Sequence, residues 1–322
     1  MHLLEVDQLS VLFKRGYNQI TAVKGLSFSV DAGGCLAIVG ESGSGKSTTA
    51  KTIMGILEKN AQVTSGSVVF QGKDLLTMKK REKKQLMGKD IAMVFQNPMT
   101  SLNPSYTVYQ QIVEVYRTHL KTRADYTEEI RALLRKVELP DPDSIMGKYP
   151  HELSGGMRQR ICIAMAWALN PALLIADEPT SALDVCTQAE ILRLMKRMAK
   201  DSGTAIVLIT HDLGVVAELA DRVMVLYAGE CMEMRDIVSF FQSPQHPYAR
   251  GLLMARPHNF DTRFHVIEGS LNPLQSAASP CAFYERCRER TALCETCCPP
   301  DVVLEKTGFV RCHLASVENG GM

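Results

Sequence analysis

The sequence contains no apolar run long enough to span a bilayer. Its longest apolar stretch, Ile161 to Ala176, is interrupted by Asn170 and Pro171. It falls short of the roughly 20 residues that a membrane helix needs. The N-terminus lacks the basic start, apolar stretch and small-residue cleavage site of a signal peptide. We therefore expect a chain that stays in the cytoplasm.

The sequence also lacks an excess of either charge. Its 322 residues include 36 Lys and Arg against 35 Asp and Glu, a formal net charge of +1. This balance argues against a broad electrostatic nucleic-acid binder and against intrinsic disorder. The one basic run, Lys79 to Lys84, is typical of a solvated helix face. Apolar residues make up 46%, as in ordinary globular proteins that bury a core.

Strand and helix patterns alternate along most of the chain. Two alternating apolar runs precede Val30 and predict antiparallel strands, and the continuous apolar runs predict buried strands at 35–39, 91–96, 172–177 and 205–210. Helical spacing predicts helices at 47–57, 107–120, 127–139, 157–169 and 188–203. We expect Thr127 to cap the helix at 127–139. The pattern at 222–230 predicts a pair of strands. This order indicates an α/β fold with a parallel sheet.

A glycine-rich loop follows the predicted strand at 35–39 and opens a helix. The segment from Gly40 to Ser47, GESGSGKS, fits the phosphate-loop pattern in the strand–loop–helix context that the pattern requires. Its backbone N–H groups and the helix N-terminus suit phosphate oxygens. Lys46 is expected to reach the β- and γ-phosphates and the Ser47 hydroxyl to bind Mg²⁺. The motif predicts nucleotide binding without specifying which class of NTPase.

Two carboxylates end the apolar run at 172–177. Asp177 closes the predicted strand and Glu178 follows it. If this strand lies beside the phosphate-loop strand, Asp177 reaches the Mg²⁺ and Glu178 can polarise the attacking water. Alone, the segment fits a simple turn equally well. Together with the phosphate loop it favours catalysis.

The order of six motifs resembles the ATP-binding cassette (ABC) family of nucleotide-binding domains across about residues 3–250. After the phosphate loop come Phe95-Gln96, LSGGM at 153–157, Ala176–Glu178, SALD at 181–184 and Thr210-His211. The resemblance implies a RecA-like core with an antiparallel β subdomain and a helical signature subdomain at about 100–170. One departure is Met157, where the family usually has Gln; Gln159 follows two residues later.

The resemblance also implies a role for each matching residue. Gln96 would sense Mg²⁺ and the γ-phosphate and touch the membrane partner, His211 would act as the switch on the γ-phosphate, and Asp184 would lie at a dimer interface. Ser154, Gly155 and Gly156 would grip ATP held by the other subunit. An aromatic residue would stack on adenine, Tyr17 by spacing or alternatively Phe13. The full expected nucleotide-binding set is Tyr17, Gly40, Ser42, Gly43, Gly45, Lys46, Ser47, Thr48 and Asp177, with Mg²⁺ held by Ser47, Gln96 and Asp177.

A single copy of each motif implies that two ATPase chains close the sites together. Soluble relatives that act on ribosomes carry two cassettes in one chain, and those that act on DNA insert a long coiled coil, so this rival class fits less well. The remaining expectation is a transporter ATPase with two separate permease subunits and a second, different ATPase chain. A periplasmic or lipid-anchored substrate-binding protein would act indirectly. The chain would then be peripheral on the cytoplasmic face of a bacterial inner membrane.

The residue composition of the sequence changes beyond Ala255, so we expect a nucleotide-binding domain at 1–255 and an extension at 256–322. The segments from Met93 to Pro104 and from His246 to Leu253 resemble the oligopeptide, dipeptide and nickel importers. Six of the ten cysteines lie in the extension. Four of them resemble the set that holds a [4Fe–4S] cluster in dipeptide-importer ATPases: Cys281, Cys287, Cys294 and Cys312.

Two other interpretations of these cysteines stay open. Cys294 and Cys297 form a pair that zinc also accepts, with His313 as a further ligand, or the thiols hold no metal. The expected activity is ATP hydrolysis that powers the import of dipeptides or oligopeptides. A nickel-chelate or glutathione importer is the alternative, because the solute is selected by other subunits.

Overall fold

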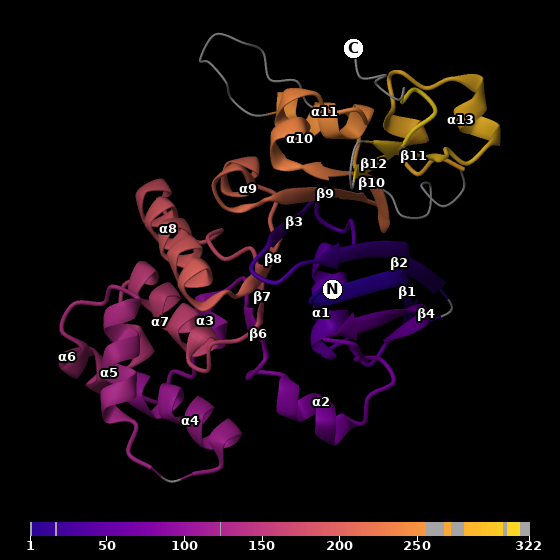
Figure 1. The fold of residues 1–322 in the computed structure, drawn as a ribbon. Helices are drawn as coiled ribbons and strands as arrows, with labels where there is room; N and C mark the ends of the chain where they lie inside the picture. Colours follow the sequence, from indigo (N-terminus) through magenta and orange to yellow (C-terminus); the bar gives the residue numbers. More distant parts are fainter. Residues whose placement is uncertain are drawn as a thin grey trace. The chain divides into compact units, whose positions relative to one another are not determined.

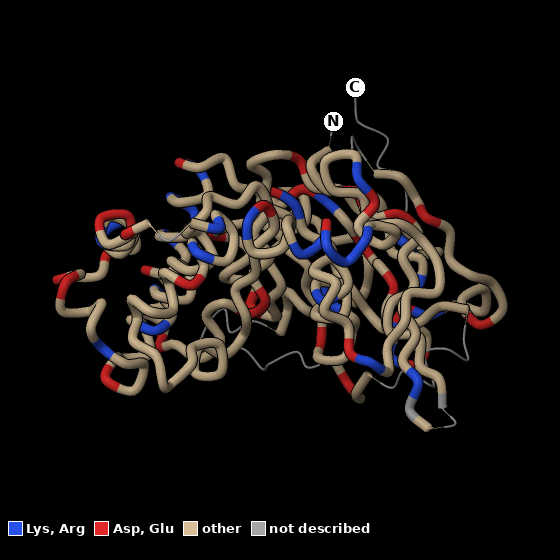
Figure 2. Tube along the Cα trace, turned by 90° about the horizontal axis from the view of Figure 1, so that it is seen from below, with Lys and Arg blue, Asp and Glu red and all other residues tan. Residues whose placement is uncertain are grey.

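The computed structural model describes residues 2–16, 18–122, 124–255, 267–271, 280–304 and 308–315, and they form two compact units. The first unit comprises 1–3, 30–35 and 71–208, and the second comprises 4–29, 36–70 and 209–322. Lys, Arg, Asp and Glu are interspersed along the trace rather than gathered by sign (Figure 2). No described helix is long and apolar enough to cross a membrane.

The first unit contains three strands of the predicted parallel type, in the order β8-β7-β6. They are β6 (Ile91–Val94), β7 (Leu173–Asp177) and β8 (Ala205–Ile209), whose last residue belongs to the second unit. β6 and β7 pair in parallel, with Ile91 opposite Leu173. Every residue of β7 and β8 is buried, which explains their continuous apolar sequences.

Helices form most of the remainder of this unit. Figure 1 shows α4, α5 and α6 gathered beside α7, and these helices contact one another. Thr107 caps α4 in a capping box with Gln110. The elements, with the short strand β5 (Lys73–Asp74), are α2 (Lys80–Leu86), α3 (Pro98–Ser101), α4 (Val108–Leu120), α5 (Thr127–Lys136), α6 (Pro142–Gly147), η1 (Pro150–Glu152), α7 (Gly155–Trp167) and α8 (Val185–Ser202).

The predicted cap of α5 is wrong. Thr127 is the first helical residue, and Tyr126 occupies the cap position without a side-chain hydrogen bond. Asp125 instead accepts hydrogen bonds from the backbone N–H and the hydroxyl of Thr127, at 3.1 and 2.6 Å. The carboxylate two residues upstream therefore replaces the expected hydroxyl cap. By contrast, α2 buries no residue, as expected for the solvated basic run at 79–84.

The second unit contains two groups of strands. An antiparallel sheet has the order β2-β1-β4, formed by β1 (Leu4–Arg15), β2 (Asn18–Val30) and β4 (Ala61–Phe70). The other group has the order β11-β12-β10-β9-β3. It comprises β3 (Cys35–Val39), β9 (Arg222–Tyr227), β10 (Glu230–Asp236), β11 (Asp301–Leu304) and β12 (Gly308–Arg311), with β3 and β9 parallel.

The C-terminal strands extend this second group. β12 pairs antiparallel with β10 at Glu233 and Met234, and Val310 on β12 is fully buried. The chain beyond 300 is thus joined by backbone hydrogen bonds to the strand pair predicted at 222–230. The helices of this unit are α1 (Lys46–Met54), α9 (Leu213–Leu219), α10 (Ile237–Gln242), α11 (Pro247–Met254), η2 (Tyr284–Arg286) and α13 (Ala292–Thr296).

The start of α11 is anchored by two buried polar side chains. Glu233 accepts the N–H groups of Gln245 and His246, and His246 Nδ1 accepts the N–H of Tyr248 at 3.0 Å. Burial lowers the pKa of His246 from 6.5 to about 3, with a further contribution from the charge of Arg250. The imidazole is therefore neutral at neutral pH and acts as a helix cap.

This cap makes stability depend on pH. Below pH 6.5 the unfolded chain binds a proton at His246 that the folded chain excludes, so stability falls as the pH drops toward 3. In His246→Asn the amide still caps α11 but does not titrate. Between pH 6.5 and 5 the free energy of unfolding of wild type should fall by about 2 kcal/mol relative to the variant. Urea titrations at both values measure this difference, and parallel pH profiles would contradict the account.

Candidate functional site

The loop from Gly40 to Gly45 has backbone conformations that favour glycine. Gly40 and Gly45 have φ of 149° and 108°. A Cβ at Gly40 would overlap the Leu226 carbonyl oxygen, and one at Gly45 would lie 2.5 Å from the Ala22 carbonyl oxygen. Gly43 also has positive φ, at 82°, but it is exposed, and a Cβ there would meet only Leu271, at 3.9 Å. The sequence pattern thus reflects steric limits on one side of the loop and an open side at its tip.

Two buried polar groups occupy this loop. The Lys46 ammonium donates hydrogen bonds to the carbonyls of Gly40 and Glu41, at 2.6 and 2.8 Å, and the residue is 6% exposed. Ser44 is fully buried, and within the described chain its hydroxyl has no hydrogen-bond partner. No side chain caps the start of α1. The N–H groups of this helix end are thus oriented for an anion, and the loop chemistry fits a nucleotide phosphate.

Asp177 and Glu178, which form the acidic end of β7, belong to the first unit. Asp177 is the last residue of β7 and is 7% exposed, whereas Glu178 is half-buried. Glu178 has φ of 47°, a conformation that non-glycine residues rarely adopt and that costs about 1–3 kcal/mol. Gln96, two residues beyond β6, donates a hydrogen bond through Nε2 to Glu178 Oε2 at 2.8 Å. The structure therefore joins two of the predicted catalytic side chains.

The LSGGM segment at 153–157, referred to here as the signature segment, leads into the first turn of α7. The Ser154 hydroxyl accepts the Met157 N–H at 3.3 Å as the helix cap, and Ser154 and Gly155 are exposed. A Cβ at Gly156 would lie 2.8 Å from Thr187 Cγ2, whereas one at Gly155 would meet only Leu183, at 3.8 Å. This segment therefore presents an uncovered helix start, and only its second glycine is sterically required.

One residue of α7 that was not assigned a role connects the signature to the acidic strand end. Gln159 is 1% exposed, and its Nε2 donates to the Pro179 carbonyl oxygen at 2.6 Å. Pro179 directly follows Glu178. The sequence signal was the Gln two positions after Met157, but only the fold reveals its partner.

Asp184 caps α8 in the same unit. Its carboxylate accepts the N–H and the hydroxyl of Thr187, at 3.0 and 2.7 Å, and these hydrogen bonds lower its pKa. The next residue, Val185, is 82% exposed, which is unusual for a large aliphatic side chain. An exposed valine beside a capping aspartate leaves an apolar spot on the surface near the signature helix.

The remaining predicted residues belong to the second unit or lie outside the described chain. His211 is exposed and lies between the end of β8 and α9, while the preceding Thr210 is buried and its hydroxyl accepts the Asp212 N–H at 3.0 Å. Ser47 and Thr48 are partly buried in α1, and Ser42 is exposed. Tyr17 lies outside the described residues, and its alternative Phe13 lies in β1.

Four cysteines of the C-terminal extension lie near enough to one another to interact electrostatically: Cys281, Cys287, Cys294 and Cys312. Burial raises the pKa of Cys281 to about 11, and the charges of Cys294, Cys287 and Cys312 raise it further. Burial likewise raises the pKa values of Cys287 and Cys312. In the described part of the chain, however, no three His, Cys, Asp or Glu side chains are arranged to hold a metal ion.

All four sulfurs accept hydrogen bonds from the backbone. Cys294 accepts the Thr291 N–H at 3.5 Å, and Cys312 accepts the Leu314 N–H at 3.4 Å. Cys281 and Cys287 accept N–H groups two residues downstream, from Phe283 and Glu289. Such bonds stabilise the thiolate form that binds metals. The chemistry of this donor set therefore fits a metal cluster, although the thiols do not converge on one point.

Comparison with known proteins identifies the family. Residues 23–181 match the family described as ABC transporter, and residues 232–294 match the C-terminal region of the oligopeptide/dipeptide transporters. The chain is 43% identical over 328 residues to the dipeptide transport ATP-binding protein DppD of Haemophilus influenzae, covering 99% of this chain and 98% of that protein. The chain belongs to the oligopeptide/dipeptide importer family of ABC ATPases.

Further relatives agree with this assignment. The oligopeptide transport ATP-binding protein OppD of Bacillus subtilis is 49% identical over 257 residues, which cover 79% of this chain and 72% of that protein. A solved dimeric ATP-binding cassette with bound ADP and phosphate has a TM-score of 0.64 and 28% identity, covering 73% of this chain and 98% of that one. The expected ABC-type fold is thereby confirmed, and the chain is an ABC-type ATPase.

The contact between Gly156 and Thr187 predicts a stability effect that a second substitution reverses. Gly156→Ala should lower the free energy of unfolding by about 1–3 kcal/mol, because its Cβ would press on Thr187 Cγ2. Adding Thr187→Ser removes that methyl group but retains the hydroxyl bonded to Asp184, and it should restore most of the loss. Denaturant titration measures both effects, with Gly155→Ala as the matched control. Equal losses in the two alanine variants would contradict this explanation.

Proposed function

We propose that this chain binds and hydrolyses ATP to power the import of dipeptides or oligopeptides across a bacterial inner membrane through separate permease subunits. The observation that carries the proposal is the match to the oligopeptide/dipeptide transporter C-terminal region, joined to near full-length similarity to a dipeptide transport ATP-binding protein. The chain would be peripheral, on the cytoplasmic face. It would pair with a second ATPase subunit and depend indirectly on a substrate-binding protein.

Binding would begin at the phosphate loop. Lys46 is already buried beside the loop and donates to two of its carbonyls. In the nucleotide complex its ammonium would pair with the β- and γ-phosphates, whose charge it matches better than neutral carbonyls. Ser47, Gln96 and Asp177 would hold Mg²⁺ through the oxygen ligands that this ion prefers, and the bound ion would supply positive charge to balance that of the phosphates.

Hydrolysis would use the Gln96–Glu178 pair. Glu178 would accept a proton from the attacking water, the water oxygen would bond to the γ-phosphorus, and ADP would leave. The hydrogen bond from Gln96 Nε2 fixes the carboxylate, and the strained backbone of Glu178 supports a functional constraint at this position. His211 would contact the γ-phosphate and report its loss.

The exposed signature supports a two-chain site. Ser154 and Gly155 are uncovered at the start of α7, and Val185 is uncovered beside Asp184. Their burial against a second ATPase chain would bring the signature to ATP held by that chain. ATP would then stabilise the closed pair, and its hydrolysis would release it.

An apolar hollow in the first unit supports a membrane partner. The hollow has a volume of about 220 Å³ and is lined mainly by apolar side chains, including Met93, Phe95 and Leu102. Phe95 is 45% exposed and directly precedes Gln96. An apolar segment of a permease that occupies the hollow would therefore contact the residue next to the Gln96–Glu178 pair.

We also propose that Cys281, Cys287, Cys294 and Cys312 hold a [4Fe–4S] cluster. Their mutual proximity and their backbone hydrogen bonds support this assignment over zinc at Cys297, which is exposed. A bound cluster would cross-link segments that are far apart in the sequence, so its role would be structural or regulatory.

Affinity purification from detergent-solubilised membranes tests the transport proposal. A tag on this chain should retain two membrane proteins and a second ATPase. Retention of ribosomes or DNA without any membrane protein would contradict it.

Substituting the proposed base should separate ATP binding from hydrolysis. In the purified transporter, Glu178→Gln should lower ATP turnover by about 10²–10⁴-fold while retaining ATP binding. The amide preserves the shape of the side chain and can still accept the Gln96 hydrogen bond. Phosphate release and nucleotide binding are measured on the same preparations, with the exposed Glu190→Gln as control. Turnover within twofold of wild type would exclude Glu178 as the base.

The cluster proposal predicts iron content and colour. After anaerobic purification the chain should contain about four irons and four sulfides per molecule, with a brown chromophore. Cys287→Ser should remove most of the iron, whereas Cys298→Ser, at an exposed thiol, should not. One zinc per chain, or iron loss of the same size in both variants, would contradict the assignment.

A further inference from the structure

The C-terminal extension reaches the phosphate loop through an ion pair. The Arg286 guanidinium donates to Glu41 Oε2 at 2.8 Å, and their side chains are 8% and 28% exposed. Glu41 is the second residue of the loop, and its carbonyl oxygen accepts a hydrogen bond from Lys46. Arg286 therefore contacts the residue whose peptide group orients the phosphate-binding lysine.

A second contact holds the same residue from its backbone. The Glu41 N–H donates to the Tyr248 hydroxyl at 2.9 Å, and Tyr248 on α11 is fully buried. Burial raises the pKa of Tyr248, so its hydroxyl is neutral at neutral pH. Glu41 is thus fixed at its N–H by Tyr248 and at its carboxylate by Arg286.

Aromatic rings place both residues. Phe283 packs against the rings of Tyr227 and Tyr248, with centroid distances of 5.2 Å to each. Tyr227 follows Leu226, whose carbonyl oxygen excludes any side chain at Gly40. The segment between Cys281 and Cys287 is therefore packed beside the rigid side of the phosphate loop.

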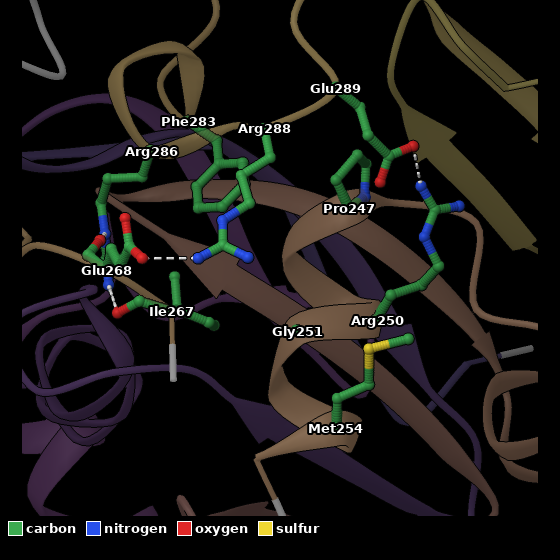
Figure 3. A pocket seen from close by; sticks show the side chains of 10 residues that line it. All are labelled: Pro247, Arg250, Gly251, Met254, Ile267, Glu268, Phe283, Arg286, Arg288 and Glu289. Atoms are coloured by element: carbon green, nitrogen blue, oxygen red, sulfur yellow. Dashed lines mark hydrogen bonds and ion pairs between the residues drawn. The ribbon is translucent and has the colours of Figure 1, made fainter. Parts of the chain in front are cut away.

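Arg286 is itself held by the backbone of the extension. Its guanidinium donates to the carbonyls of Ile267, Glu268 and Gly269, at 3.3, 2.9 and 3.2 Å. Figure 3 shows Arg286 beside Ile267 and Glu268 on one side of a cavity, with the pairs Arg288–Glu268 and Arg250–Glu289 along it. Unlike Arg286, Arg288 is 70% exposed, and the contacts that the structure records for it do not include the phosphate loop.

We propose that Arg286 and Tyr248 are positioning residues that hold Glu41, and with it Lys46, in the arrangement that receives ATP. The inference rests on the proposed ATP binding and assigns the extension a part in it. A loop that is ordered before binding loses less conformational entropy when it closes on phosphate. By linkage, a change in the cysteine-bearing segment would alter nucleotide affinity, and bound nucleotide would stabilise that segment to the same extent.

The affinity of the purified full-length chain for a fluorescent ATP analogue with Mg²⁺ tests this proposal. Arg286→Gln should raise the Kd about tenfold, because a charge-assisted hydrogen bond that orders the loop is lost. Tyr248→Phe should raise it about threefold, and Arg286→Lys should recover part of the loss. The matched control is Arg288→Gln, on the other side of Cys287, which should bind as wild type.

A double-mutant cycle with Glu41→Gln distinguishes positioning from general destabilisation. If Arg286 acts through Glu41, Arg286→Gln should add little to the effect of Glu41→Gln. Additive effects of the two substitutions, or wild-type affinity in both Arg286→Gln and Tyr248→Phe, would overturn the proposal. If Arg286→Gln does not fold, Tyr248→Phe and Glu41→Gln still decide the question. A wild-type chain that binds no nucleotide would instead refute the proposed function.

Discussion

The steric constraint at the phosphate loop is the feature on which the other assignments depend. The Leu226 carbonyl on β9 leaves no room for a side chain at Gly40, and the Ala22 carbonyl limits Gly45 in the same way. The loop is therefore packed closely against β9 and β2 on one side and is exposed at Gly43. Lys46 is buried in this arrangement, and its ammonium donates hydrogen bonds to the carbonyls of Gly40 and Glu41. A buried ammonium bonded to neutral carbonyls is suited to exchange them for phosphate oxygens.

The first unit carries a different kind of constraint. There, side-chain hydrogen bonds link the segments around the proposed base: Gln96 donates to Glu178, and Gln159 donates to the carbonyl of Pro179. These two bonds tie the segment after β6 and the signature helix to the end of β7. A shift of α7 would therefore act on the acidic strand end directly. The exposed Ser154 and Val185 fit a site that is completed by another chain.

Much of the fold followed from local patterns, because buried strands and amphipathic helices have distinct periods. The buried strands β3, β7 and β8 are examples, as is α4 (Val108–Leu120), which was predicted at 107–120. Thr127 failed as a cap because it is already the first helical residue, and both its N–H and its hydroxyl donate to the Asp125 carboxylate. The partners of Gln159 and Arg286 were beyond sequence reasoning, since they lie 20 and 245 residues away. Such pairs depend on the tertiary fold and leave no periodic signal. Within the candidate site, the roles of the motif residues stay predictions, and so does that of Tyr17, which lies outside the described residues.

Peptide accumulation in proteoliposomes tests the central claim most directly. The complex purified through this chain would be reconstituted with ATP on the side of the ATPase subunits and labelled dipeptides, with the binding protein, on the other side. The account predicts uptake that requires ATP and is lost in Lys46→Ala. Uptake that persists without ATP or with Lys46→Ala, or a complex that moves no peptide of any length, would contradict it.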